Sequence, residues 1–289
     1  MALEFTLSFE GASADNNLLD FYDAAAAFSA FQRTLALTAH LVINGEIITQ
    51  APSLKGAQIL SYPVEQGSWK AVAVVAGTLL LSGGVASRDS VLGHIFTSTY
   101  DYVLNEALGF HVDFDKTLGE QLEEYRRQTD VVPKSLDEGK LQALIEKNEN
   151  SLKDLHRPIS QSRTAETANI GQSNNGRIVK KTGPTLDFDT YEYINVTRLS
   201  DSQIYRAGKV SSYNTNTFKG RIYIESEGRP IPFTIADSAR NPRNISKIVR
   251  SLSSNAIDRF DAQAEIEFEA LTFESKNGRL KSYLIINIK

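Results

Sequence analysis

Basic residues recur at helical spacing near the end of this 289-residue chain. Arg243, Lys247 and Arg250 follow one another at four and three residues, which places their side chains on one face of an α-helix, and Arg240 stands just upstream. The opposite face is apolar and carries Ile245, Ile248, Val249 and Leu252. Such a basic stripe can bind polyanions, and it is also the ordinary solvent side of an amphipathic helix.

A second group of chemistry-bearing residues mixes aromatic rings with cations in the preceding segment. The rings are Tyr205, Tyr213, Phe218 and Tyr223, and the cations are Lys209, Lys219 and Arg221. Interleaved rings and cations can stack on nucleic-acid bases or nucleotides and neutralise their phosphates. The same rings can instead fill the interior of a small domain. We therefore predict ligand-binding roles for Lys219 and Arg221, with a core role for the rings as the alternative.

Residues for catalysis or metal binding are sparse. The densest group is His111, Asp113 and Asp115, which would share one face of a strand, but no fourth ligand is evident and a polar loop is the preferred interpretation. Asp187 and Asp189 have the same weakness. The chain has no cysteine, no activated serine motif and no glycine-rich phosphate loop. We expect no catalytic residue, metal or cofactor, and a protein that is not an enzyme.

The basic helix lies within a series of short β patterns. Strands are predicted at Tyr191–Leu199, Ala207–Asn214, Phe218–Ser226, Ile231–Ile235, Ala264–Phe273 and Leu280–Ile288. One helix, Ile245 to Ser254, falls between the fourth and fifth of these. Several strands, one helix and a final hairpin predict a small barrel of the OB kind, which the helix closes.

The first half of the chain predicts a mixed α+β domain. Strands are expected at Glu4–Glu10, Glu46–Gln50, Gln58–Tyr62 and Ser68–Val75, and helices from about Asn16 to Val42, from Ser90 to Leu108 and within 113–156. The overall fold class is therefore α+β followed by an OB-like barrel.

A run of seventeen uncharged residues, Ala71–Ser87, follows the only tryptophan, Trp69. It must be buried in a core, a subunit interface or lipid, because solvating apolar surface costs about 25 cal/mol per Å². Exposed on a monomer, the run would promote aggregation, so we predict a homo-oligomer. The interface residues would be Trp69, Leu79, Leu80, Leu81 and Tyr100. Conditional membrane contact is the alternative, since seventeen residues lie at the lower limit of a bilayer span.

Composition divides the chain into three parts. Residues 158–186 are rich in polar residues and glycine and show no apolar periodicity, which predicts a linker or exposed loop between domains at 1–157 and 187–289. Residues 1–157 carry 12 basic and 21 acidic residues, a net charge of −9. Residues 158–186 carry 4 and 1, a net charge of +3, and residues 187–289 carry 15 and 13, a net charge of +2. The first residues have no basic segment followed by an apolar one, so we expect a cytoplasmic protein.

Three stretches carry a family resemblance: Leu18–Pro52, Glu65–Lys70 (EQGSWK) and Leu92–Asp113. Through them the sequence resembles a family of uncharacterised bacterial and phage-borne proteins, in which such an N-terminal domain is paired with a small five-stranded barrel. The resemblance implies the two-domain organisation. It implies no activity and no site residues, and it suggests a setting in phage–host conflict.

These observations predict an oligomeric, non-enzymatic protein whose C-terminal barrel recognises a partner or ligand. A conditional membrane-active effector that uses Ala71–Ser87 is one alternative. A protein that binds nucleic acid or nucleotides through the barrel is the other.

Overall fold

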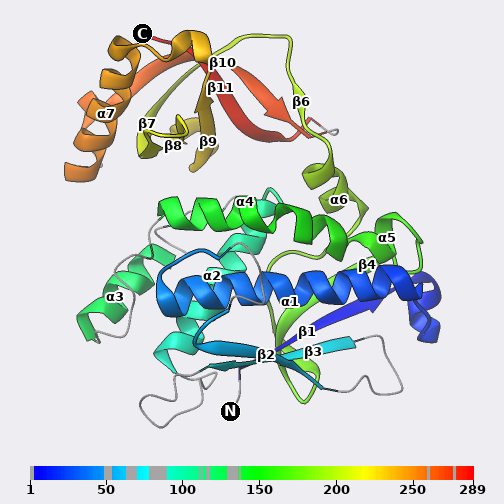
Figure 1. Cartoon of the computed structure of the whole chain (residues 1–289). Helices are drawn as coiled ribbons and strands as arrows, with labels where there is room; N and C mark the ends of the chain where they lie inside the picture. Colours follow the sequence, from blue (N-terminus) through cyan, green and yellow to red (C-terminus); the bar gives the residue numbers. More distant parts are fainter. Residues whose placement is uncertain are drawn as a thin grey trace. The chain divides into compact units, whose positions relative to one another are not determined.

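The computed structural model describes residues 3–48, 54–62, 70–77, 90–110, 112, 114, 118–128, 136, 138–258, 261–275 and 278–289. The chain forms two compact units, Met1–Ile194 and Asn195–Lys289, which we call the N-terminal unit and the barrel unit. The fold is α+β, with a mixed N-terminal domain and a closed five-stranded barrel that carries a helix, as the sequence predicted (Figure 1).

An antiparallel sheet forms one layer of the N-terminal unit. Its strands are β1 (Leu3–Glu10), β2 (Ala57–Ser61), β3 (Lys70–Gly77), β4 (Thr167–Asn174) and β5 (Arg177–Lys181). They lie in the order β2-β3-β1-β4-β5, so the N-terminal strand is central. Phe5 pairs with Ala73 on one side and with Gln172 on the other, which aligns the apolar residues of β1 and β3 on one face.

Helices α1 and α2 lie against that face of the sheet. The helices of the unit are α1 (Phe21–Asn44), α2 (Val91–Ala107), α3 (Glu120–Gln128), α4 (Glu138–Leu155), α5 (Arg157–Ser160) and α6 (Phe188–Asn195). Asp20 caps α1 by accepting the N–H of Asp23, and Gly45 ends the helix in a left-handed conformation. The helix predicted from about Asn16 therefore begins later, at Phe21. Helices α1, α2 and α4 pack against one another above the strands (Figure 1).

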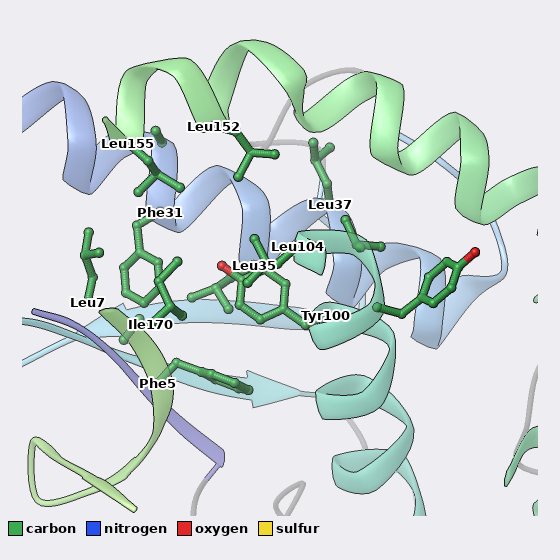
Figure 2. Close-up of a cluster of buried hydrophobic side chains, with 14 of the residues drawn as sticks. Phe5, Leu7, Phe31, Leu35, Leu37, Tyr100, Leu104, Leu152, Leu155 and Ile170 are labelled. Carbon is green, nitrogen blue, oxygen red and sulfur yellow. The ribbon is translucent and has the colours of Figure 1, made fainter. Parts of the chain in front are cut away.

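The core of the N-terminal unit fills the space between this sheet and its helices. Figure 2 shows Phe5, Phe31, Tyr100, Leu152 and Ile170 converging from five different elements. Tyr100 on α2 is 0% exposed, and its hydroxyl group lies 2.8 Å from the Thr34 hydroxyl oxygen. The interface role predicted for Tyr100 is therefore wrong: the apolar face of α2 is used to build the monomer's own core.

The segment predicted to be a linker, residues 158–186, is instead part of the N-terminal unit. Strand β4 pairs with β1 along six residues of that strand, from Phe5↔Gln172 to Glu10↔Thr167. Strand β5 then pairs with β4. The boundary between the units falls at Ile194, so the predicted domain start at 187 is also displaced, and 188–195 is helix α6 rather than the start of a strand.

Buried polar contacts hold the returning chain against the first helix. The Asp23 carboxylate accepts hydrogen bonds from Arg157 Nε at 2.9 Å and from the Ser162 N–H at 3.1 Å. The His156 ring is completely buried, with Nδ1 2.6 Å from the Leu152 carbonyl oxygen and Nε2 2.9 Å from Thr190 Oγ1. These contacts join α1, α4 and α6 into one body.

Five strands of the barrel unit form a closed β-barrel. They are β7 (Ile204–Asn214), β8 (Lys219–Ile224), β9 (Arg229–Ile235), β10 (Glu265–Glu274) and β11 (Leu280–Ile288); short β6 (Arg198–Leu199) extends the sheet beside β10. The pairs β7–β8, β8–β9, β10–β11 and β10–β7 are antiparallel, and β9–β11 is parallel. Helix α7 (Pro242–Ile257) lies between β9 and β10, which is the OB-like arrangement predicted.

The uncharged run Ala71–Ser87 is only partly described. Its first residues complete β3, where Ala73 and Val75 are buried against the helices. Trp69, Leu79, Leu80 and Leu81, the other predicted interface residues, lie outside the described residues. Glu46–Ile48, expected to begin a strand, belongs to no strand. Within the described part of the chain, no helix combines the length and apolar character needed to cross a bilayer.

Candidate partner-binding surface

The basic helix α7 is fixed to the barrel by its inner face. Asn241 caps the helix by accepting the Asn244 N–H at 3.0 Å, and Asn244 Nδ2 donates to the Ala239 carbonyl oxygen at 3.0 Å. Ile248 is buried in the barrel core. Ser251 Oγ accepts the Val210 N–H at 3.0 Å and donates to the Ala264 carbonyl oxygen, which ties the helix to β7 and to the turn before β10. The outer face of α7 is therefore presented in one orientation.

The four cations predicted on this helix have different environments. Lys247 Nζ donates to the Ile288 carbonyl oxygen at 3.0 Å, so its ammonium group is held against the last strand. Arg240 donates from Nε to the Ile235 carbonyl oxygen at 3.0 Å, and its NH1 pairs with Asp237 at 2.7 Å. Arg243 and Arg250 are exposed. The predicted stripe thus contains two structural cations and two that face solvent.

A shallow groove of about 750 Å³ runs along the outer face of α7. Pro242, Ile245 and Val249 give it an apolar floor, and Arg240 and Arg250 line the same groove. Val249 is 45% exposed although it is aliphatic. Ser246 and Ser253 are among the polar residues of the lining, with Asn241 and Ser254. The groove can therefore bind an apolar group and an anionic group side by side.

Sequence reasoning did not single out the two serines or Pro242. Their spacing could have identified them, because residues 242, 246, 249 and 253 follow one another at intervals of four, three and four and so share one face of a helix. Charge drew attention to Arg243 and Lys247, which do not line the groove.

Two of the predicted stacking rings belong to the barrel interior, as the alternative interpretation held. Tyr213 packs on Phe233 with ring centroids 6.3 Å apart and an interplanar angle of 10°, and burial raises the pKa of Tyr213. Phe218 is covered by the Arg240 guanidinium, which lies 4.5 Å from the ring centroid. Arg221, predicted to bind ligand, is 2% exposed and thus withdrawn from the surface.

The remaining rings lie on an outer face of mixed charge. Tyr223 is the cross-strand neighbour of Lys209, and Lys219 is exposed on the same strand. The Lys289 ammonium lies 4.5 Å from the centroid of the Tyr205 ring and 3.5 Å from a Glu269 carboxylate oxygen. Glu265, which is paired with Lys209, and Glu267 lie on the same strand as Glu269, β10. Acidic side chains therefore line this face next to the basic ones. This pattern disfavours a continuous phosphate-binding track.

Metal binding finds no support in the described residues, among which no three His, Asp or Glu side chains cluster as a metal site would need. Asp187 Oδ1 accepts the Thr190 N–H at 2.8 Å and so serves the start of α6. His111, Asp113 and Asp115 lie outside the described residues.

Comparison with known proteins identifies families of unknown function. Residues 203–289 match a family of unknown function, DUF7947, which corresponds to the barrel unit. No curated protein and no solved structure matches the chain. Residues 5–195 match a domain of unknown function, DUF7946, whose end coincides with the end of the N-terminal unit. The chain therefore belongs to the DUF7946 family.

Proposed function

We propose that this protein is a non-enzymatic binding protein whose barrel recognises an acidic, partly apolar segment of a partner protein through the groove on α7. One observation carries the proposal: the aliphatic residues Val249 and Ile245 line the same groove as the exposed Arg250. An exposed aliphatic side chain gains free energy only from an apolar partner, whereas Arg250 favours a carboxylate.

The lining of the groove favours a protein segment over nucleic acid. Single-stranded nucleic acids are held largely by base stacking on aromatic rings. No aromatic ring is among the described residues that line the groove, and the nearby Phe218 ring is covered by Arg240. Serine hydroxyls at Ser246 and Ser253 suit the backbone groups of a peptide.

Binding of labelled peptides to the full chain tests the proposal. The probes are a peptide that alternates glutamate and leucine, a poly-glutamate peptide of the same length and a poly-dT oligonucleotide, each followed by fluorescence anisotropy. Arg250→Gln should weaken binding of the mixed peptide about tenfold, and Val249→Ser about fivefold. Arg243→Gln and Ile257→Ser are the matched controls, because both remove exposed side chains of α7 that do not line the groove.

Nucleic-acid binding is the second candidate, because Arg243 and Arg250 are both exposed on α7. If it is correct, poly-dT binds more tightly than either peptide and Arg243→Gln weakens binding as much as Arg250→Gln. The slope of log affinity against log salt should then fall by about one unit for each lost phosphate contact. That result would refute recognition of an acidic protein segment.

Homo-oligomer formation is part of the proposal. Its support in the fold is the end of the N-terminal sheet, where β2 exposes Leu60 to 50% and the following Tyr62 to 53%. Apolar side chains on an outer strand favour pairing with another chain. Light scattering at micromolar concentration should therefore show an assembly that Leu60→Lys weakens, and a strict monomer would contradict this part.

The resemblance to phage-borne proteins suggests phage–host conflict as the setting of the proposed partner. Plaque assays on cells with and without the protein test that setting, and Arg250→Gln should lose any effect that the intact protein has.

A further inference from the structure

A polar pocket of about 250 Å³ lies within the N-terminal unit, apart from the barrel. Helix α2 contributes Thr97, Ser98 and Asp101, and α3 contributes Gln121. Lys180, Lys181 and Thr182, at the end of β5, complete the lining. Residues 97, 98 and 101 share one face of α2 because they are spaced by about one helical turn. The volume is close to the lower end of the range for pockets that bind small molecules.

Hydrogen bonds between the contributing elements build the walls of this pocket. The Gly183 N–H donates to Asp101 Oδ1 at 2.7 Å, and Ser98 Oγ donates to Gln121 Oε1 at 2.9 Å. Gln172 Nε2 on β4 donates to Thr97 Oγ1 at 2.9 Å. Gly183 also packs so closely that a Cβ there would lie 2.7 Å from Leu104 Cβ. The end of β5 is thus docked on α2, and the lining side chains are preorganised.

One residue of the lining carries a buried hydroxyl group that is unpaired within the described part of the chain. Thr182 is 1% exposed, and its Oγ1 makes no hydrogen bond within the described part of the chain. Buried hydroxyl groups in folded proteins are almost always hydrogen-bonded. A molecule bound in the pocket that Thr182 lines would pair with this hydroxyl once the threonine side chain turns toward it.

The charges of the lining select the chemical class of that molecule. The lining contains two lysines, Lys180 and Lys181, and one carboxylate, Asp101, so its net charge is +1. Lys181 Nζ also donates to Thr185 Oγ1, which orients its ammonium group. This balance favours an anionic ligand over a neutral zwitterion such as an amino acid. Because Asp101 Oδ1 already accepts the Gly183 N–H, Oδ2 is left to accept from a ligand donor.

We propose that this pocket binds a small phosphorylated polyol, of the sugar-phosphate kind. The phosphate group lies at Lys180 and Lys181, and the hydroxyl groups pair with Asp101 and with the unpartnered Thr182. The proposal is independent of the barrel groove, since it rests on different residues and a different ligand.

Isothermal titration calorimetry of the full chain tests this assignment. The probes are glycerol 3-phosphate, ribose 5-phosphate and glucose 6-phosphate, compared with inorganic phosphate and ribose. At least one phosphorylated polyol should bind about tenfold more tightly than either inorganic phosphate or ribose. Thr182→Val and Lys180→Gln should each weaken that binding about tenfold, which is the usual size of one hydrogen bond or ion contact to a charged ligand. Lys153→Gln, on the surface of α4, is the matched control and should change nothing.

Thermal unfolding without ligand separates a binding role of Thr182 from a structural one. Valine has nearly the shape of threonine, so replacing an unpaired hydroxyl should leave the melting temperature unchanged or raise it. A lower melting temperature would mean that the hydroxyl already has a partner. The proposal is overturned if none of the three polyol phosphates binds at millimolar concentration, if free amino acids bind instead, or if Thr182→Val and Lys180→Gln bind as well as the control.

Discussion

The buried ring of His156 should make the stability of the N-terminal unit depend on pH. Burial lowers the pKa of His156 from 6.5 to about 4, while the Leu152 carbonyl and the Asp187 carboxylate oppose the shift. Nδ1–H donates to the Leu152 carbonyl oxygen, and in the neutral ring Nε2 accepts from the Thr190 hydroxyl. Burial disfavours the charged ring in the folded protein. In the unfolded chain the ring gains a proton below about pH 6.5. The unfolded state therefore binds more protons between pH 6.5 and 4, and stability falls as the pH is lowered through that range.

The size of this effect follows from the pKa difference. A shift from 6.5 to about 4 corresponds to about 3 kcal/mol in total, of which roughly 2.5 kcal/mol is lost on going from pH 8 to pH 4.5. Other groups also titrate in this range, so the quantity to measure is the difference in free energy of unfolding between the wild type and His156→Gln.

Urea unfolding, followed by circular dichroism at several pH values, measures that difference. At pH 8 the variant should be less stable by about 1–3 kcal/mol, because glutamine does not reproduce both ring contacts. By pH 4.5 this disadvantage should have shrunk by about 2.5 kcal/mol, since glutamine does not titrate. His94→Gln, which removes an exposed histidine of α2, is the matched control. A wild-type advantage that stays constant from pH 8 to pH 4.5 would refute the assignment of a neutral buried ring.

Four further substitutions test the packing of the two units. Tyr100→Phe removes the hydroxyl bonded to Thr34 and should cost about 1 kcal/mol in urea unfolding without changing the oligomeric state, whereas dissociation would restore an interface role for Tyr100. Gly183→Ala should lower stability by about 1–3 kcal/mol, because φ is +71° and the new Cβ would crowd Leu104; an unchanged melting temperature would contradict this packing. Ile248→Ala should cost about 2–5 kcal/mol in the barrel core, while Val249→Ala on the exposed side should cost less than about 1 kcal/mol; equal costs would mean that the inner and outer faces of α7 are misassigned.

Much of the barrel could be predicted because its strands follow local rules. Alternating apolar residues mark β8, β9 and β10, and the helix predicted from Ile245 to Ser254 lies within α7, which begins three residues earlier at Pro242. The segment Tyr191–Leu199 was wrongly expected to be a strand. Its aromatic residues favour strands, but Asp187 and Thr190 form the hydrogen-bonded start of a helix, and Tyr193 and Ile194 face the N-terminal core.

The supposed linker shows why apolar periodicity failed in the N-terminal unit. Strand β4 has the sequence TANIGQSN, in which the buried residues include Gln172 and Ser173. Ser173 Oγ donates to the Glu4 carboxylate at 2.7 Å and accepts from Thr6 at 2.8 Å. A strand whose buried side chains are paired with polar partners from distant segments is not visible to a search for apolar residues.

Only some residues of the candidate groove could be predicted from their charge. Arg240 and Arg250 were selected by charge and do line it. Lys247 was selected by the same criterion, yet its ammonium group donates a hydrogen bond to the Ile288 carbonyl oxygen, forty-one residues further along the chain. Helical spacing identifies which side chains share a face, but it does not reveal which cations are hydrogen-bonded to the rest of the fold.

Polar pairing in the N-terminal unit also strengthens the case for the pocket beside Thr182. The side chains of Glu4, Thr6 and Ser173 form a continuous buried hydrogen-bond network, and Glu4 also accepts the Gly176 N–H at 2.8 Å. Strands β1 and β4 therefore pair their buried polar groups closely. Thr99 and Asn148 also have side-chain atoms without partners in the described residues, but of the three only Thr182 lines the pocket. Since an unpaired buried hydroxyl destabilises the empty protein, its place in a preorganised, cationic lining favours a binding role over a packing fault.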